Sequence, residues 1–156
     1  MMSLTSEYAL RAVVYIAQNE ECWPLAGSEI ASASGVPSKY LAKILGDLVR
    51  HGVLDARRGR GGGFSLARNA KETPLWEVLA PFERFKRTTC PFEDQGCPDA
   101  SPCASHPRWE RVLHTYHGFL KETTIHSIAF DRPSGARNGS HAGKRSRKKS
   151  TLTRRR

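Results

Sequence analysis

Metal-type ligands gather in one short segment of the chain. Between Cys90 and His106, which we call the cysteine segment, lie three of the four cysteines and one of the six histidines, spaced C-x6-C-x5-C-x2-H. Thiolate and imidazole groups at such spacing are typical of a metal or cluster site rather than of a hydrophobic core. The spacing therefore predicts a metal centre that draws on Cys90, Cys97, Cys103 and His106.

Three kinds of site fit these donors. Three cysteines and one harder ligand can hold an iron–sulfur cluster with a labile position, which suits a sensor. A structural zinc ion with Cys3His ligation uses the same groups. A thiol-only redox segment needs no metal. A structural disulfide is disfavoured, because we expect the chain in the reducing cytoplasm.

The residues before this segment carry the pattern of a DNA-binding domain. Residues 4–18 repeat apolar side chains at a helical period, and Glu7 and Arg11 stand four apart, so they can pair on one face. Residues 28–34 and 39–50 predict two more helices, with Ser38 as the cap of the second and a tight turn between them. This order predicts a helix-turn-helix.

A hairpin is predicted directly after the helix-turn-helix. Residues 53–56 and 64–67 are short strand candidates, joined by the run R-R-G-R-G-G-G. A nucleotide-binding phosphate loop would need a following helix and a G-K-[ST] ending, and the run has neither. The fold class we expect is mainly α with a small β-hairpin, a winged helix-turn-helix, followed by a long C-terminal helix.

The last predicted helix is long and carries an apolar stripe. Thr73 and Pro74 mark the start of one helix, and a single further helix is expected from Arg108 to about Phe130. Its stripe should pack on the first helix and on the same helix of a second copy. We therefore expect a DNA-binding domain over residues 1–82, the cysteine segment and a dimerisation helix over 83–130, and a disordered basic tail over 131–156.

Most of the positive charge belongs to this tail. The net charge is +10, but residues 131–156 hold ten Lys and Arg against Asp131, which leaves +1 for the rest. The tail can hold DNA non-specifically or act as a solubilising extension, and the sequence favours neither. No window approaches the ~20 apolar residues of a membrane span, and a signal pattern is absent, so we expect a cytoplasmic protein without membrane contact. Cys22 stands alone and is expected to be a small, buried or half-buried hydrophobe.

One run of residues resembles a known family. Residues 36–68 read V-P-S-K-Y-L-A-K-I-L-G-D-L-V-R-H-G-V-L-D-A-R-R-G-R-G-G-G-F-S-L-A-R, and residues 6–11 read S-E-Y-A-L-R. Both resemble the Rrf-type winged-helix transcriptional regulators, a family that includes IscR, NsrR, RirA and CymR. The resemblance covers about residues 1–130 and leaves out the tail.

The resemblance implies a homodimeric regulator with a cluster held by Cys90, Cys97 and Cys103. The fourth ligand varies within the family. His106 matches the histidine of IscR-like members, whereas Glu7 matches the acidic residue that NsrR-like members use. The first cysteine gap is one residue longer here than is usual, which leaves [2Fe–2S] and [4Fe–4S] open.

Two sets of side chains are predicted to contact DNA, one at the start of the recognition helix and one on the wing. The first set is Ser38, Lys39, Tyr40 and Lys43, and the second is Arg57, Arg58 and Arg60. A dimer implies double-stranded DNA with a two-fold symmetric operator.

We therefore expect a repressor whose operator affinity is set by an iron–sulfur cluster that senses redox state, nitric oxide or iron and cluster supply. A zinc-stabilised RNA-binding module is the alternative, although the basic residues lack interleaved aromatics. An enzyme with a small-molecule substrate is not expected, because no nucleophile–base set or paired carboxylates stand out.

Overall fold

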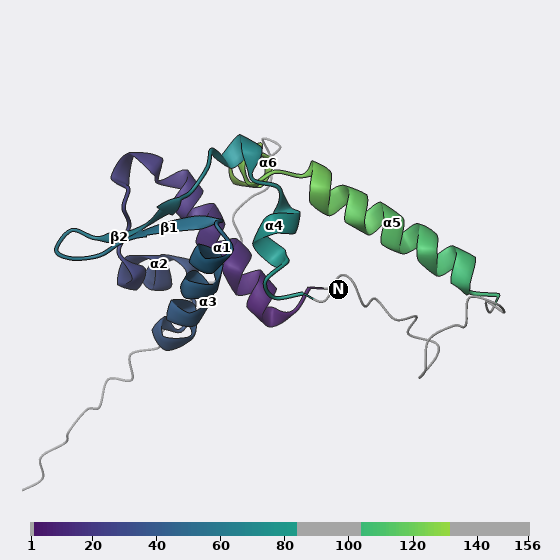
Figure 1. Cartoon of the computed structure of the whole chain (residues 1–156), viewed down its shortest axis with the longest axis horizontal. Helices are drawn as coiled ribbons and strands as arrows, with labels where there is room; N and C mark the ends of the chain where they lie inside the picture. The colour runs from purple at the N-terminus through teal and green to yellow at the C-terminus, as the bar shows by residue number, and fades with distance from the viewer. Residues whose placement is uncertain (1, 84–103, 132–156) are drawn as a thin grey trace, which may run out of the picture.

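The computed structural model describes residues 2–83 and 104–131, and it is mostly helical with one two-stranded antiparallel sheet (Figure 1). The elements in chain order are α1 (Leu4–Gln18), η1 (Glu20–Cys22), α2 (Gly27–Ser34), α3 (Ser38–Arg50), β1 (Leu54–Arg57), β2 (Gly63–Leu66), η2 (Ala70–Glu72), α4 (Leu75–Leu79), α5 (His106–Glu122) and α6 (Ile125–Phe130). The arrangement matches the predicted helix-turn-helix and hairpin.

Helix α1 forms the centre of the core. Its apolar face is fully buried and contacts α2, α3, α4, α6 and β2. Ser3 caps the helix, because its hydroxyl accepts a hydrogen bond from the Ser6 backbone N–H over 3.3 Å. The first helix thus has the predicted bounds.

Helices α2 and α3 form the helix-turn-helix. Helix α2 ends at Gly35, which has a φ of 70° and so occupies the left-handed region that favours glycine. Helix α3 buries Leu41, Ile44, Leu45 and Leu48 against the core. Ser38 is the first residue of α3 rather than its cap, since Pro37 takes the cap position without a side-chain hydrogen bond.

The hairpin is anchored to the segment that precedes α2. Strands β1 and β2 pair from Leu54↔Leu66 to Arg57↔Gly63. Leu25 exchanges two backbone hydrogen bonds with Phe64, over 2.9 and 2.8 Å. A Cβ at Gly63 would lie 2.2 Å from the Leu25 carbonyl oxygen, so only glycine permits this approach. The wing therefore has a fixed base.

The C-terminal part departs from the prediction of one helix from Arg108 to Phe130. It forms two helices, α5 and α6, with a break at Thr123 and Thr124. The Leu75 N–H donates to the Thr123 carbonyl and the Ile125 N–H donates to the Thr73 carbonyl, each over 2.9 Å. These tertiary hydrogen bonds take the place of helical ones, so the helix is interrupted there.

The sequence predicted one helix that would pack both on the first helix and on a second copy of the chain. Because of the break, two separate helices are available for these contacts. Helix α6 packs on α1, whereas α5 contacts α4 and projects away from the core (Figure 1). None of the helices in the described ranges is long and apolar enough to cross a membrane.

Cys22 is exposed, which corrects the expectation of a buried residue. The neighbouring Trp23 packs against the core instead, and its indole Nε1–H donates to the Ile16 carbonyl over 2.8 Å. The large aromatic side chain occupies the apolar space and leaves Cys22 at the surface.

Candidate DNA-binding surface and cluster ligands

The first turns of α3 present the predicted DNA-contacting side chains to solvent. Ser38, Lys39, Tyr40 and Lys43 are all exposed. Tyr40 is nevertheless held in place, because its ring lies edge-on to Tyr8 with centroids 5.8 Å apart. Its hydroxyl is hydrogen-bonded to the Thr5 hydroxyl. The N-terminal turn of α1 therefore supports the turn of α3 that is predicted to contact DNA.

The wing arginines are also exposed. Arg57 ends β1, and Arg58 and Arg60 lie in the turn that follows. Within residues 2–83 and 104–131, none of the three makes an ion pair with an acidic side chain. Their guanidinium groups are thus available to phosphates or to a narrow minor groove.

Glycine is required to close the wing turn. Gly59 and Gly61 have φ values of 96° and 75°, and the Gly62 N–H donates to the Gly59 carbonyl over 2.9 Å. A Cβ at Gly62 would lie 2.2 Å from the Arg57 carbonyl oxygen. The glycine-rich run thus serves a tight turn that spaces the arginines.

Cys90, Cys97 and Cys103 lie outside the described residues. Among the residues that the structure describes, no three His, Cys, Asp or Glu side chains come together as a metal site.

The two candidates for the fourth ligand are both placed. His106 begins α5, and its Nε2 lies 3.3 Å from Oε1 of Glu110. Its Nδ1 is buried and has no hydrogen-bond partner within the described ranges. Glu7 lies in the first turn of α1, exposed, with a carboxylate oxygen 3.9 Å from Nη2 of Arg11. The predicted Glu7–Arg11 pair is thus confirmed, and both side chains keep a donor atom for a metal.

Sequence reasoning missed Glu83, the last residue that the structure describes before residues 84–103. Its Oε1 accepts hydrogen bonds from the Ser3 backbone N–H and from the Ser6 hydroxyl, each over 2.6 Å. Burial opposes ionisation of Glu83, but these hydrogen bonds outweigh it and lower the pKa of the carboxyl group. Burial, followed by the charge of Glu83, raises the pKa of Tyr116 on α5. No local pattern could reveal Glu83, because its partners stand 80 and 77 positions away.

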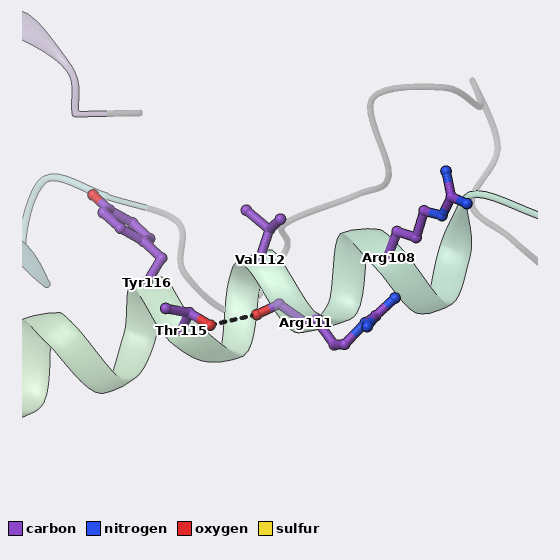
Figure 2. A pocket seen from close by; sticks show the side chains of 5 residues that line it. All are labelled: Arg108, Arg111, Val112, Thr115 and Tyr116. Atoms are coloured by element: carbon purple, nitrogen blue, oxygen red, sulfur yellow. Dashed lines mark hydrogen bonds between the residues drawn. The ribbon is translucent and has the colours of Figure 1, made fainter.

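Helix α5 leaves apolar side chains in solvent. Val112 and Phe119 are 56% and 52% exposed, whereas Leu120 is fully buried on the side that faces the core. A hollow of about 470 Å³ lies along the helix. Its lining residues are Arg108, Arg111, Val112, Thr115 and Tyr116 (Figure 2). Within the part of the chain that the structure describes, the apolar stripe that the sequence predicted is thus uncovered only in part, at Val112 and Phe119.

Comparison with known proteins connects this geometry to one family. The family model Rrf2, described as an iron-dependent transcriptional regulator, matches residues 2–131. The HTH-type transcriptional regulator IscR of Escherichia coli is 29% identical over 126 residues, which span 80% of this chain and 78% of that protein.

Two solved structures share the fold. T. potens IscR superimposes with a TM-score of 0.69 at 21% identity and covers 84% of this chain and 87% of its own. CymR, the global cysteine regulator of B. subtilis, gives 0.71 at 19% identity and covers 85% and 98%. Both likenesses confirm the mainly helical winged-helix fold class.

Proposed function

Since this chain belongs to the Rrf2 family of transcriptional regulators, we propose that it is a homodimeric repressor whose operator affinity is set by an iron–sulfur cluster. DNA binding and transcriptional regulation, rather than catalysis, follow from the family itself. The cluster, the dimer and the sign of regulation are the proposed steps. The observation that carries the proposal is the sequence spacing of Cys90, Cys97 and Cys103 before His106, the residue that begins α5.

The residues present fit a cluster. The three cysteines supply the soft thiolates that iron–sulfur clusters need. Nδ1 of His106 is a buried nitrogen without a hydrogen-bond partner in the described part of the chain, so a nearby metal would satisfy it. Glu7 offers the alternative oxygen ligand on α1. When bound, such a cluster supplies a centre that oxidants, nitric oxide or iron loss can alter.

DNA recognition would use α3 and the wing together. The exposed first turns of α3 suit the major groove, and Arg57, Arg58 and Arg60 on the wing suit the minor groove or its phosphates. Their availability within the described residues supports this assignment. In a dimer, two such units would bind a two-fold symmetric operator with half-sites one or two helical turns apart.

A second copy of the chain would cover the outer side of α5. Val112 and Phe119 stand seven positions apart, which places them on one side of the helix. Val112 and Tyr116 project from the same side in Figure 2. A closed two-fold interface buries the same helix face of both copies, which accounts for apolar side chains exposed in one copy.

Anaerobic purification of the full chain tests the cluster. The expected protein is brown, absorbs in the visible range and contains iron and acid-labile sulfide. A DNA duplex selected in vitro by this protein should then bind more tightly to the cluster-loaded form than to the cluster-free form. Equal affinity of the two forms would overturn the proposed control, and colourless protein with zinc would indicate a structural site.

Matched substitutions decide the ligands. Cys90→Ser, Cys97→Ser and Cys103→Ser should each abolish the visible absorbance, whereas Cys22→Ser should leave it unchanged because Cys22 lies at the surface of η1. His106→Ala and Glu7→Ala compare the two candidates for the fourth position. The true ligand is the one whose loss changes the absorbance spectrum or the cluster's lifetime in air.

A further inference from the structure

The carboxylate of Glu83 joins the chain that leads into the cysteine segment to the start of α1. Its Oε1 accepts from the Ser3 backbone N–H and the Ser6 hydroxyl, both over 2.6 Å. Ser6 is fully buried, and its hydroxyl also lies 3.1 Å from that of Ser3. Glu83 thus places a negative charge at the N-terminus of α1, where the helix dipole and unpaired N–H groups favour it.

The same turn of α1 holds the DNA-facing turn of α3. Thr5 lies between the two serines that bind Glu83, and its hydroxyl is hydrogen-bonded to the Tyr40 hydroxyl. The Tyr40 ring also packs edge-on against Tyr8, one turn further along α1. A shift of the first turn of α1 would therefore also move Tyr40.

A hollow borders both the Thr5–Tyr40 contact and the residues just before Glu83. It has a volume of about 260 Å³ and lies between the exposed side of α3 and the residues that precede Glu83. Its lining includes Thr5 on α1, Tyr40 and Lys43 on α3, and Pro81 and Phe82. The chain that enters the cysteine segment thus borders the same space as the DNA-facing turn.

Glu83 also influences a side chain of α5. Burial, followed by the charge of Glu83, raises the pKa of Tyr116. Among the described residues, the Tyr116 hydroxyl has no hydrogen-bond partner. One carboxylate thus lies where α1, the approach to the cysteine segment and α5 meet.

We propose that Glu83 is a positioning residue that transmits the state of the cysteine segment to the recognition helix, through the Ser3–Ser6 turn of α1 and the Thr5–Tyr40 hydrogen bond. Cys90 follows Glu83 by seven positions, so a change of ligation there acts on a short stretch of chain. A displacement of Glu83 changes its hydrogen bonds to Ser3 and Ser6, which shifts the first turn of α1 and, through Thr5, Tyr40. The regulatory part of this inference rests on the proposed cluster, whereas the coupling of Glu83 to Tyr40 does not.

The test compares operator affinity in full-length Glu83→Gln and wild type, with and without the cluster, on the duplex selected by the wild-type protein. Glutamine keeps the shape but loses the charge, so the ratio of loaded to cluster-free affinity should fall at least about fivefold, the lower range of measured allosteric couplings. The visible absorbance should be retained. Glu77→Gln is the matched control, since Glu77 lies on α4 and pairs with Arg68 on the surface.

A double-substitution cycle tests the path itself. Thr5→Val removes the hydroxyl that meets Tyr40, and Thr5→Ser restores it. If Glu83 acts through Thr5, the losses of Glu83→Gln and Thr5→Val will not add, and Thr5→Ser will behave as wild type. Additive losses, or an unchanged ratio in Glu83→Gln, overturn the proposal.

Different results would overturn the proposed control by the cluster and the proposed coupling of Glu83 to Tyr40. If wild type shows no difference between loaded and cluster-free protein, the cluster control is wrong, and the cycle in cluster-free protein still decides the coupling. If Glu83→Gln does not fold, Ser6→Ala removes one of the two donors to the same oxygen and keeps the Ser3 N–H. Ser6→Ala with a wild-type ratio and additive behaviour would equally overturn the coupling.

Discussion

At the scale of single residues, Gly62 controls how the wing presents its arginines. The turn brings the backbone of position 62 against the Arg57 carbonyl oxygen, which leaves no space for a side chain. Arg57 and Arg58 are adjacent and Gly59 separates them from Arg60, so the placement of the three arginines depends on this turn. The position is therefore constrained although it carries no functional group.

Gly62→Ala should weaken operator binding about tenfold, because the added Cβ would force the strained turn to rearrange at a cost of about 1–3 kcal/mol. The melting temperature should change little, since the wing tip is exposed. Gly46→Ala is the control, because its Cβ would meet nothing nearer than Arg50 Nη1 at 4.0 Å. Fluorescence anisotropy on labelled duplex measures both, and unaltered affinity for Gly62→Ala would contradict the structure.

Glu83 makes a pH-dependent contribution to stability. Its folded pKa is lowered, so the stabilisation is present above the ordinary glutamate pKa and is lost as pH falls through the folded value. Glu83→Gln should cost about 1 kcal/mol at neutral pH, since hydrogen bonds to a partly exposed carboxylate are screened. Urea unfolding of cluster-free wild type and Glu83→Gln should show this gap in the free energy of unfolding at pH 7. The gap should become smaller below about pH 4. A gap that persists in acid would refute this account.

At the scale of elements, the break at Thr123 and Thr124 decides what α5 can do. The break turns α6 back onto α1 and leaves α5 as a separate helix held mainly through α4 (Figure 1). Thr124 caps α6 by accepting from the Ser127 N–H over 3.3 Å. An uninterrupted helix would carry Ile125 and Ala129 away from the core in which they are buried.

Val112→Glu should dissociate the proposed dimer, because a charge would be buried without a partner in an apolar interface. We expect the dimer dissociation constant to rise at least about a hundredfold. His114→Glu is the matched control, since the two positions differ by about 200° around the helix. Sedimentation velocity over a concentration series measures both, with circular dichroism to verify folding. A Val112→Glu variant that stays dimeric would exclude this interface.

At the scale of the whole molecule, positive charge is divided unevenly. Residues 131–156 carry +9 of the net +10, so the winged helix itself is nearly neutral. Selective binding must then depend on where α3 and the wing place a few cations, whereas a tail that binds DNA would add attraction that is independent of DNA sequence.

Deletion of residues 132–156 removes ten Lys and Arg and no acidic residue. The association constant for a random duplex should fall. Its logarithm should also decline less steeply with the logarithm of the salt concentration, because fewer counterions are released. Discrimination between the selected and random duplexes should increase. Arg57→Ala, Arg58→Ala and Arg60→Ala combined should instead reduce affinity for the selected duplex. An unchanged salt slope after the deletion would mean that the tail only aids solubility.

The sequence by itself determined the elements whose signals are local. The helical period of residues 4–18 predicted α1 with its observed bounds, and Gly35 and the glycine-rich run marked the turns. The residues of α3 and the wing that are predicted to contact DNA follow from their positions within these elements, and their role stays a prediction. The cysteine spacing and the resemblance indicated the proposed cluster ligands, but Cys90, Cys97 and Cys103 lie outside the described residues, so that assignment stays a prediction.

Only the tertiary structure decided the features that join distant parts of the chain. The break between α5 and α6 depends on hydrogen bonds to Thr73 and Leu75, whereas the apolar pattern alone continues through it. Glu83 acquires its role from Ser3 and Ser6, and Tyr40 from Thr5, across separations that periodicity does not record. Local pattern fixes which face of an element is buried, but the partner of a polar side chain is set when the elements pack together.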